Sequence, residues 1–179
     1  MKTFRSLTLI EAWIWCMSRL DAMHAHLVRY GFAYIALLFG YWAFAMKYEL
    51  DINVSNSLSG VLYLVEKHAL PERNDYAAFL YPSDFIYQKN SRFLKRVAGV
   101  AGDTVESRNH QFFVNGKLVG EAMPVTSKGL PIEESGFKGV IPAGHYYMQG
   151  DHPKSLDSRY KVVGLVSGQM IIGRGFRLF

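Results

Sequence analysis

Cysteine is almost absent from this chain of 179 residues, which carries only Cys16. A single cysteine excludes an intramolecular disulfide framework, a cysteine-rich zinc site and an iron–sulfur cluster. Charged residues are also sparse, at 20% of the chain, whereas half of all residues are hydrophobic. This composition is too apolar for a disordered protein, and the length suits one ordinary domain with its own core.

The residue clusters typical of metal and nucleic-acid sites are missing as well. The six histidines show neither H-x-x-x-H nor H-E-x-x-H spacing, so we expect no metal site. The net charge of +5 could indicate a nucleic-acid partner, but no dense run of Lys and Arg occurs after residue 46. No helix-turn-helix pattern is present either, and we expect no nucleic acid to bind.

Charged side chains are absent from residues 30–46 (YGFAYIALLFGYWAFAM), which Arg29 and Lys47 bound. This stretch is near the lower limit of length for crossing about 30 Å of hydrocarbon, and the flanking cations can reach the headgroups. A buried core helix is the alternative, but such helices usually have a polar face and this stretch has none. We therefore predict a transmembrane anchor at residues 30–46.

Basic residues predominate before this anchor, with four Lys or Arg against two acidic residues in 1–29. The positive-inside rule then places the N-terminus in the cytoplasm and residues 47–179 outside the inner membrane, in the periplasm of a Gram-negative host. A cleaved signal peptide is the alternative, because Ala43 and Ala45 form an A-x-A pattern after the apolar run. The long basic region favours a retained anchor in contact with membrane lipid.

The N-terminal segment, residues 1–29, contains a second apolar stretch at residues 7–17, which Glu11 interrupts. It is short for a membrane span, although a second span is one interpretation. The other is an interfacial helix that holds Trp13 and Trp15 at the headgroups. We expect the interfacial helix.

After residue 46 the apolar residues occur in short runs separated by Gly, Pro and Asn, a pattern typical of strands. The runs span 60–65, 77–81, 93–97, 111–119 and 144–149. The clearest contains Asn115-Gly116, which supplies the positive φ angles of a tight hairpin turn. We predict a mainly β fold, a sheet or a barrel-like arrangement, over residues 47–179. Residues 106–140 form a hairpin and a loop-rich insertion, which either borders a site or is an ordinary connection.

Three separated polar segments contain residues that could perform chemistry: 53–60, 93–105 and 150–159. Taken singly, each has a plain structural interpretation. The first could be a solvated serine-rich linker, and the second a solvent-exposed strand with a Lys-Arg pair. The third could be a tight turn capped by an ion pair.

Lys95 has one property that suits a general base. Alternation along a strand places Phe93, Lys95 and Val97 on one face, so the lysine has apolar neighbours. A lysine acts as a base only when it is neutral, and desolvation disfavours its ammonium form.

Together, the three segments resemble the bacterial type I signal peptidase family. The resemblance rests on residues 55–58 (SNSL), 95–105 (KRVAGVAGDTV) and 150–159 (GDHPKSLDSR), in the family's order. It implies a signal-peptidase-like β-sheet or barrel catalytic domain behind an N-terminal transmembrane helix, and it calls for no cofactor or metal. The short chain and residues 53–63 further resemble the conjugative-transfer, or TraF-type, peptidases that process pilin precursors.

The resemblance also implies roles for individual residues. Ser57 is the expected nucleophile and Lys95 the expected general base, while the Ser57 backbone N–H and the Ser55 hydroxyl form the oxyanion hole. The expected supporting residues are Ser155, which orients the lysine, and the ion pair of Asp157 and Arg159. The expected pocket for small substrate residues is lined by Leu58, Phe93 and Leu94.

The function implied is a membrane-anchored serine endopeptidase that removes leader peptides from exported precursor proteins. A conjugative pilin subunit in a type IV secretion apparatus is the first candidate precursor. The alternatives are a general secretory signal peptidase I and a non-catalytic anchored β module of a secretion or conjugation assembly.

Overall fold

The structure is a computed structural model and describes residues 8–55, 57–126 and 128–179. The chain divides into two compact units, residues 1–46 and 47–179.

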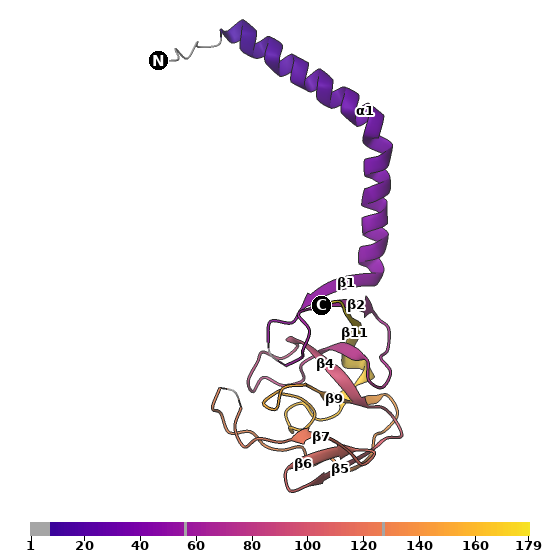
Figure 1. Cartoon of the computed structure of the whole chain (residues 1–179), viewed down its shortest axis with the longest axis vertical. Coiled ribbons are helices and arrows are strands. Elements are labelled where there is room, and N and C mark those ends of the chain that lie inside the picture. The colour runs from indigo at the N-terminus through magenta and orange to yellow at the C-terminus, as the bar shows by residue number, and fades with distance from the viewer. Residues whose placement is uncertain (1–7, 56, 127) are drawn as a thin grey trace. The chain divides into compact units, whose positions relative to one another are not determined.

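The described residues of the N-terminal unit, from Leu9 onward, form one continuous helix, α1 (Leu9–Lys47), of 39 residues, whose last residue begins the second unit (Figure 1). Thr8 and Glu11 cap its start reciprocally: the Thr8 N–H donates to the Glu11 carboxylate over 2.8 Å, and the Glu11 N–H donates to the Thr8 hydroxyl over 3.3 Å. The helix has no buried residue, and it is long and apolar enough to cross a membrane.

No break separates the predicted interfacial segment from the predicted anchor. Residue 7 lies outside the described residues and Thr8 precedes the helix, but residues 9–17 and all of 30–46 belong to α1. The connecting residues 18–29 (SRLDAMHAHLVR) contain no Gly or Pro and are rich in Ala, Leu, Met and Arg, which favour helix. The helix therefore passes through the residues between the two predicted segments.

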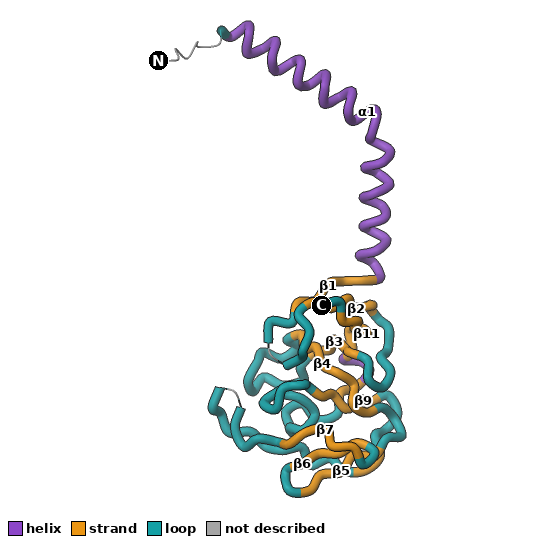
Figure 2. The backbone as a smooth tube through the Cα atoms, viewed as in Figure 1, coloured by secondary structure: helices purple, strands orange, loops and turns teal. Residues whose placement is uncertain are grey.

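The second unit is built from two antiparallel sheets, as Figures 1 and 2 show. The larger sheet has seven strands in the order β1 (Tyr48–Ile52), β2 (Leu62–Lys67), β11 (Ile171–Arg177), β3 (Tyr76–Leu80), β4 (Arg92–Gly99), β9 (His145–Gln149) and β10 (Val166–Ser167). The smaller sheet has four, in the order β7 (Lys117–Glu121), β6 (Gln111–Val114), β5 (Thr104–Arg108) and β8 (Gly139–Val140). A short 3-10 helix, η1 (Gly168–Met170), precedes β11. The mainly β prediction is confirmed.

The larger sheet curls back on itself. Arg92, at the start of β4, donates to Asp51 over 2.7 Å and to Glu49 over 2.6 Å, and both acceptors lie on β1. Three strands, β2, β11 and β3, separate β1 from β4 in the sheet. These ion pairs therefore join strands that are not neighbours, and they connect the two strands that border the polar segments.

Three strands of the smaller sheet lie at the start of the predicted insertion, residues 106–140, and its short strand β8 lies at the end. Its central hairpin turns at Asn115 (φ 48°) and Gly116 (φ 75°), which confirms the predicted turn. The sheet begins slightly earlier than the predicted insertion, since β5 starts at Thr104. The insertion is thus a folded second layer with its own strands.

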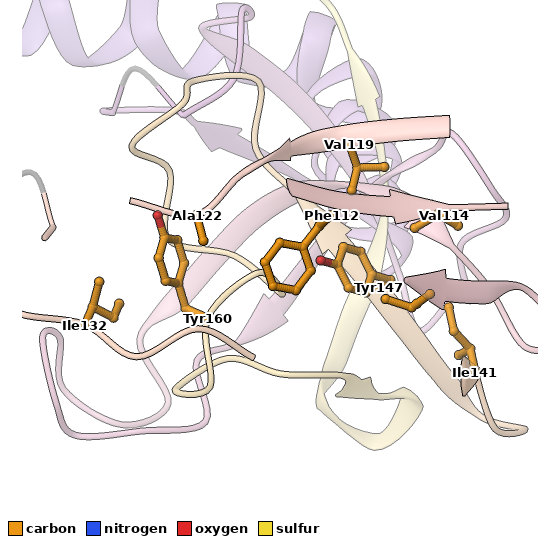
Figure 3. Packing of buried hydrophobic residues seen from close by; sticks show 9 residues of the cluster. Phe112, Val114, Val119, Ala122, Ile132, Ile141, Tyr147 and Tyr160 are labelled. Carbon is orange, nitrogen blue, oxygen red and sulfur yellow. The ribbon is translucent and has the colours of Figure 1, made fainter. Parts of the chain in front are cut away.

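An apolar core joins the two sheets (Figure 3). Phe112 and Val114 of β6 pack with Tyr147 of β9 and with Tyr160 from the loop that follows it. Phe112 is fully buried and Tyr147 is 1% exposed. Because β9 also pairs with β4, this core fixes the smaller sheet to the strand that carries Lys95.

Candidate active site

A pocket of about 480 Å³ in the second unit brings the three polar segments together. Its walls include Ser55 and Ser57 from the first segment, Lys95 from the second and Ser155 from the third. Residues separated by up to a hundred positions in sequence therefore share one cavity. The pocket is also of the size and mixed polarity typical of a binding site.

The serine segment follows β1 and is shaped by Asn53. The Asn53 Nδ2 donates to the carbonyl oxygens of Leu58 over 3.0 Å and of Gly60 over 2.9 Å. Its Oδ1 accepts from the N–H of Ser55 over 3.3 Å and from the Ser55 hydroxyl over 3.1 Å. The Oγ atoms of Ser55 and Ser57 lie 2.8 Å apart. The turn thus presents two serine hydroxyls side by side at the pocket.

Asn53 was not among the site residues predicted from the sequence. The signal was present, because an Asn that begins a serine-rich turn commonly bonds the backbone two residues further on.

Lys95 is buried in β4, with only 5% of its surface exposed. Its Nζ lies 5.5 Å from the centre of the Phe93 ring. Burial lowers the pKa of Lys95 from its ordinary 10.5 to about 8; the charge of Asp157 opposes this shift and that of Arg159 reinforces it. The structure agrees with the expectation of a desolvated lysine, and a substantial fraction of this amine is neutral near pH 8.

The third segment is hydrogen-bonded to the first. The Asp151 N–H donates to the Ser57 carbonyl over 2.7 Å, and the Ser59 N–H donates to the Asp151 carboxylate over 3.2 Å. Gly150 packs against Ser155 so closely that an added Cβ would overlap the Ser155 hydroxyl. That hydroxyl is buried and has no hydrogen-bond partner among the described residues.

Asp157 and Arg159 form a buried ion pair of 2.8 Å, with side chains 0% and 2% exposed. The Asp157 carboxylate also accepts from the Gly150 N–H over 2.9 Å. The Arg159 guanidinium donates to the Ser155 carbonyl over 3.3 Å. The expected ion pair is therefore present, and it braces both ends of the turn that contains Ser155.

Arg159 also reaches the smaller sheet, where it donates to the Glu121 carbonyl over 2.7 Å. Next to this contact, Gly120 has φ of 148°, and a Cβ there would lie 2.7 Å from Arg159 Nη1. The Gln149 side chain donates to the neighbouring Val119 carbonyl. The side chains of Arg159 and Gln149 thus connect strand β7 to the third segment, residues 150–159, and to the strand that precedes it.

The apolar wall of the pocket differs in one respect from the expectation. Phe93 and Leu94 line the pocket, but Leu58 is not among its lining residues. Leu58 is 5% exposed and packs in an apolar cluster that includes Tyr63 and Val65, because the turn directs it into the core beneath β2.

Two further segments complete the wall. Ile86 and Tyr87 come from the loop after β3, and Thr126 and Ile132 come from the insertion. Tyr87 packs edge-on against Phe93 with ring centres 5.3 Å apart. Of the two interpretations of the insertion, the structure supports the one in which it borders the site.

A buried amine and two adjacent serine hydroxyls in one pocket are the groups that a serine hydrolase with a lysine base requires. The described part of the chain holds no group of three His, Cys, Asp or Glu that could bind a metal ion. The class that fold and site define is a β-rich serine hydrolase candidate behind an apolar N-terminal helix.

The chain belongs to the signal peptidase family, peptidase S26, whose family model matches residues 23–179. It is 32% identical over 143 residues to a signal peptidase I of Pseudomonas aeruginosa, covering 61% of this chain and 49% of that protein. It is 31% identical over 178 residues to a signal peptidase I of Pseudomonas fluorescens, covering 75% of this chain and 61% of that protein. The chain thus spans about half to three fifths of the length of these curated relatives.

Among solved structures, a crystal structure of a signal peptidase I from Enterococcus faecalis matches with 29% sequence identity and a TM-score of 0.39. The match covers 59% of this chain and 96% of that chain.

Proposed function

We propose that this protein is a membrane-anchored serine endopeptidase that removes leader peptides from exported precursor proteins. Ser57 is the nucleophile and Lys95 the general base. The observation that carries the proposal is the Lys95 amine, which is buried, has its pKa lowered to about 8 and lines the same pocket as Ser57. Membership of the signal peptidase family supports the same activity.

The first half-reaction forms an acyl-enzyme. The Ser57 hydroxyl attacks the scissile carbonyl while its proton passes to the neutral Lys95 amine. The oxyanion that develops accepts hydrogen bonds from the Ser57 N–H and the Ser55 hydroxyl. When the tetrahedral intermediate collapses, the Lys95 ammonium gives its proton to the leaving amine, and the mature protein departs. Ser57 then carries the leader as an ester.

The second half-reaction releases the leader. Lys95 is neutral again and takes a proton from water, which attacks the ester carbonyl in the same oxyanion environment. Collapse of this intermediate returns the proton to Ser57. A lysine with an ordinary pKa would be almost fully protonated near neutral pH, so burial of Lys95 makes both steps feasible.

The supporting residues hold this arrangement in place. The unpartnered, buried hydroxyl of Ser155 suits the role of orienting the Lys95 amine within the shared pocket. Asp157 and Arg159 fix the backbone around Ser155, and their opposite charges act on the pKa of Lys95 in opposite directions. These residues position the catalytic groups and take no part in proton transfer.

The anchor in this proposal is the apolar part of α1. Its length and composition are sufficient for a membrane span. The charge distribution before residue 30 favours an N-terminus in the cytoplasm and a peptidase unit on the outer face of the inner membrane.

Two classes of precursor are candidates. The relatives named signal peptidase I favour general secretory precursors. The resemblance of residues 53–63 to the conjugative-transfer peptidases favours a pilin subunit. Co-expression with one precursor of each class, followed by mass spectrometry of the products, separates the two. A product lighter by one water than the linear mature chain would indicate that the new end is also joined into a circle.

The activity is tested with two variants, Ser57→Ala and Lys95→Ala, each with a matched control. Ser59→Ala is the control for the serine, because Ser59 is exposed and its hydroxyl contacts Arg177. Lys117→Ala is the control for the lysine, because Lys117 is exposed in the hairpin. We expect both catalytic variants to lose precursor processing and both controls to keep it. Normal processing by Ser57→Ala would overturn the proposal and leave a binding module as the alternative.

A further inference from the structure

We propose that Asn53 is a positioning residue that sets the Ser55 hydroxyl for the oxyanion of the reaction. The proposal rests on the proposed function and adds a residue to its machinery. Asn53 itself touches no reacting atom in this account, and it acts through Ser55.

The four hydrogen bonds of the Asn53 amide fix its orientation. Both partners of Nδ2 are carbonyl oxygens, of Leu58 and Gly60, which only accept. One partner of Oδ1 is the N–H of Ser55, which only donates. The amide therefore has a single arrangement that satisfies the turn, and its oxygen must face Ser55. The Asn53 backbone N–H also donates to the Val61 carbonyl over 2.8 Å, which ties down the start of the turn.

The hydroxyl of Ser55 has one proton and two acceptors within reach. Asn53 Oδ1 lies 3.1 Å from Ser55 Oγ, and Ser57 Oγ lies 2.8 Å away. When Asn53 accepts the proton, Ser55 Oγ is free to accept from the Ser57 hydroxyl. When a substrate oxyanion forms, the Ser55 proton turns toward it, since a charged acceptor forms the stronger bond. Asn53 thus holds the donor in place before the oxyanion exists.

Preorganisation is the reason this contact matters. The Ser55 hydroxyl stabilises the transition state best if its oxygen is already in place, so that only the proton has to turn from Asn53 Oδ1 to the oxyanion during the reaction. Without Asn53, the Ser55 side chain would lose its hydrogen bond to Oδ1, and the turn would lose its bonds to two carbonyls. The expected cost therefore falls on kcat, with little change in KM.

The test is a double-mutant cycle between Asn53 and Ser55 on the full chain in detergent, with a fluorogenic peptide that carries Ala-X-Ala before the scissile bond. We expect Asn53→Ala to lower kcat about 30-fold, somewhat less than loss of an oxyanion donor itself. In the Ser55→Ala background the same change should lower kcat less than about threefold, because the residue it acts through is gone. A purely structural role would give equal factors in both backgrounds, and that result would overturn the inference.

Tyr63→Phe is the matched control. It removes the 3.1 Å hydrogen bond from the Gly60 N–H to the Tyr63 hydroxyl in the same turn but touches neither serine. We expect it to lower the melting temperature and leave kcat within about twofold of wild type. A loss of kcat as large as that of Asn53→Ala would assign the effect to the turn as a whole and contradict the inference.

Asn53→Ser covers the case in which Asn53→Ala does not fold. A serine hydroxyl can accept from the N–H two residues further on, as Asn53 Oδ1 does, but it does not replace the bonds of Nδ2. Its effect on kcat should again be at least fivefold smaller when Ser55 is Ala, because Ser55 is the residue through which position 53 acts. Failure of the proposed function is read separately, from full activity of Ser57→Ala.

Discussion

The guanidinium of Arg159 occupies the space that a side chain at Gly120 would need, since a Cβ there would lie 2.7 Å from Arg159 Nη1. The two residues belong to different parts of the second unit: Gly120 lies on β7 of the smaller sheet, and Arg159 ends the third polar segment, residues 150–159. The insertion and the candidate active site therefore share a buried contact. A substitution in the smaller sheet at Gly120 is therefore expected to displace residues of the candidate active site.

Gly120→Ala tests this connection. We expect it to lower both the melting temperature and kcat, because the new methyl group displaces Arg159 from Asp157 and the φ of 148° strains any L-residue. Gly116→Ala is the control, since Gly116 has φ of 75° with no atom near its missing Cβ. The control should lose about 1 kcal/mol of stability and no activity. Equal kinetic effects of the two variants would contradict the connection.

The pH dependence of kcat/KM follows from the lowered pKa of Lys95. A general base must be deprotonated, so activity should rise with pH through about 8. Between pH 7 and pH 9 the neutral fraction of this amine increases about tenfold, and the rate should follow it. Initial rates on the fluorogenic peptide across this range provide the measurement. A profile that is flat from pH 7 to pH 9 would argue against Lys95 as the base.

The same burial predicts that Lys95→Met is inactive but more stable. The pKa of this amine is lower in the folded chain than in the unfolded chain, so the unfolded state binds more protons between about pH 8 and 10.5. Burial of the protonated Lys95 therefore lowers the free energy of unfolding of the wild type by about 3 kcal/mol below pH 8. This loss disappears as the pH rises toward 10.5, because the amine is then neutral in both states.

The gain in free energy of unfolding of Lys95→Met over the wild type should accordingly be largest at neutral pH and become smaller at alkaline pH. Denaturant unfolding of wild type and variant at pH 7 and pH 10 measures it. Lys117→Met, at an exposed position, should show no such pH-dependent gain. An unchanged or lower stability of Lys95→Met at pH 7 would mean that the ammonium is well accommodated in the pocket.

Arg92→Gln tests the ion pairs that join β1 to β4. The Arg92 side chain is one third exposed, so we expect a modest loss of stability, about 1 kcal/mol. We also expect kcat/KM to fall several-fold, because Asn53 directly follows β1 and Lys95 lies three residues beyond Arg92, so that displacing these strands moves both residues. Arg108→Gln removes a comparable but more exposed pair with Glu106, 3.7 Å long, and should change neither quantity. An Arg92 variant with wild-type kinetics would show that these ion pairs do not position the site.

Much of the second unit could be predicted from local sequence patterns. Apolar runs at 60–65 and 77–81 correspond to β2 and β3 within two residues, and the Asn115-Gly116 turn occurs as predicted. Strand alternation also predicted apolar neighbours for Lys95, and the family resemblance supplied its role as a base. Each of these features depends on a few adjacent residues, which is why sequence patterns reveal them.

The features that could not be predicted depend on contacts between distant residues. No local pattern indicates that Arg92 reaches Asp51 or that Arg159 packs on Gly120, since these pairs meet only when the sheets form. Leu58 was expected at the pocket because the family resemblance implies a pocket residue there, but the turn that Asn53 shapes directs it into the core. The continuity of α1 through residues 18–29 was not predicted, because the two apolar stretches were considered separately; the residues between them contain no Gly or Pro that would end a helix.

The close packing of Gly150 against Ser155 has a consequence for how such sequences diverge. Gly150 does not have a positive φ, so its backbone would accept other residues, and it is mainly the Ser155 side chain that excludes them, with the Ser57 carbonyl oxygen 3.0 Å from an added Cβ. Alanine at 150 would require glycine at 155 and thus the loss of the hydroxyl. A descendant of this chain that replaces Gly150 is therefore expected to lose the Ser155 side chain as well, whereas one that loses only Ser155 can keep Gly150.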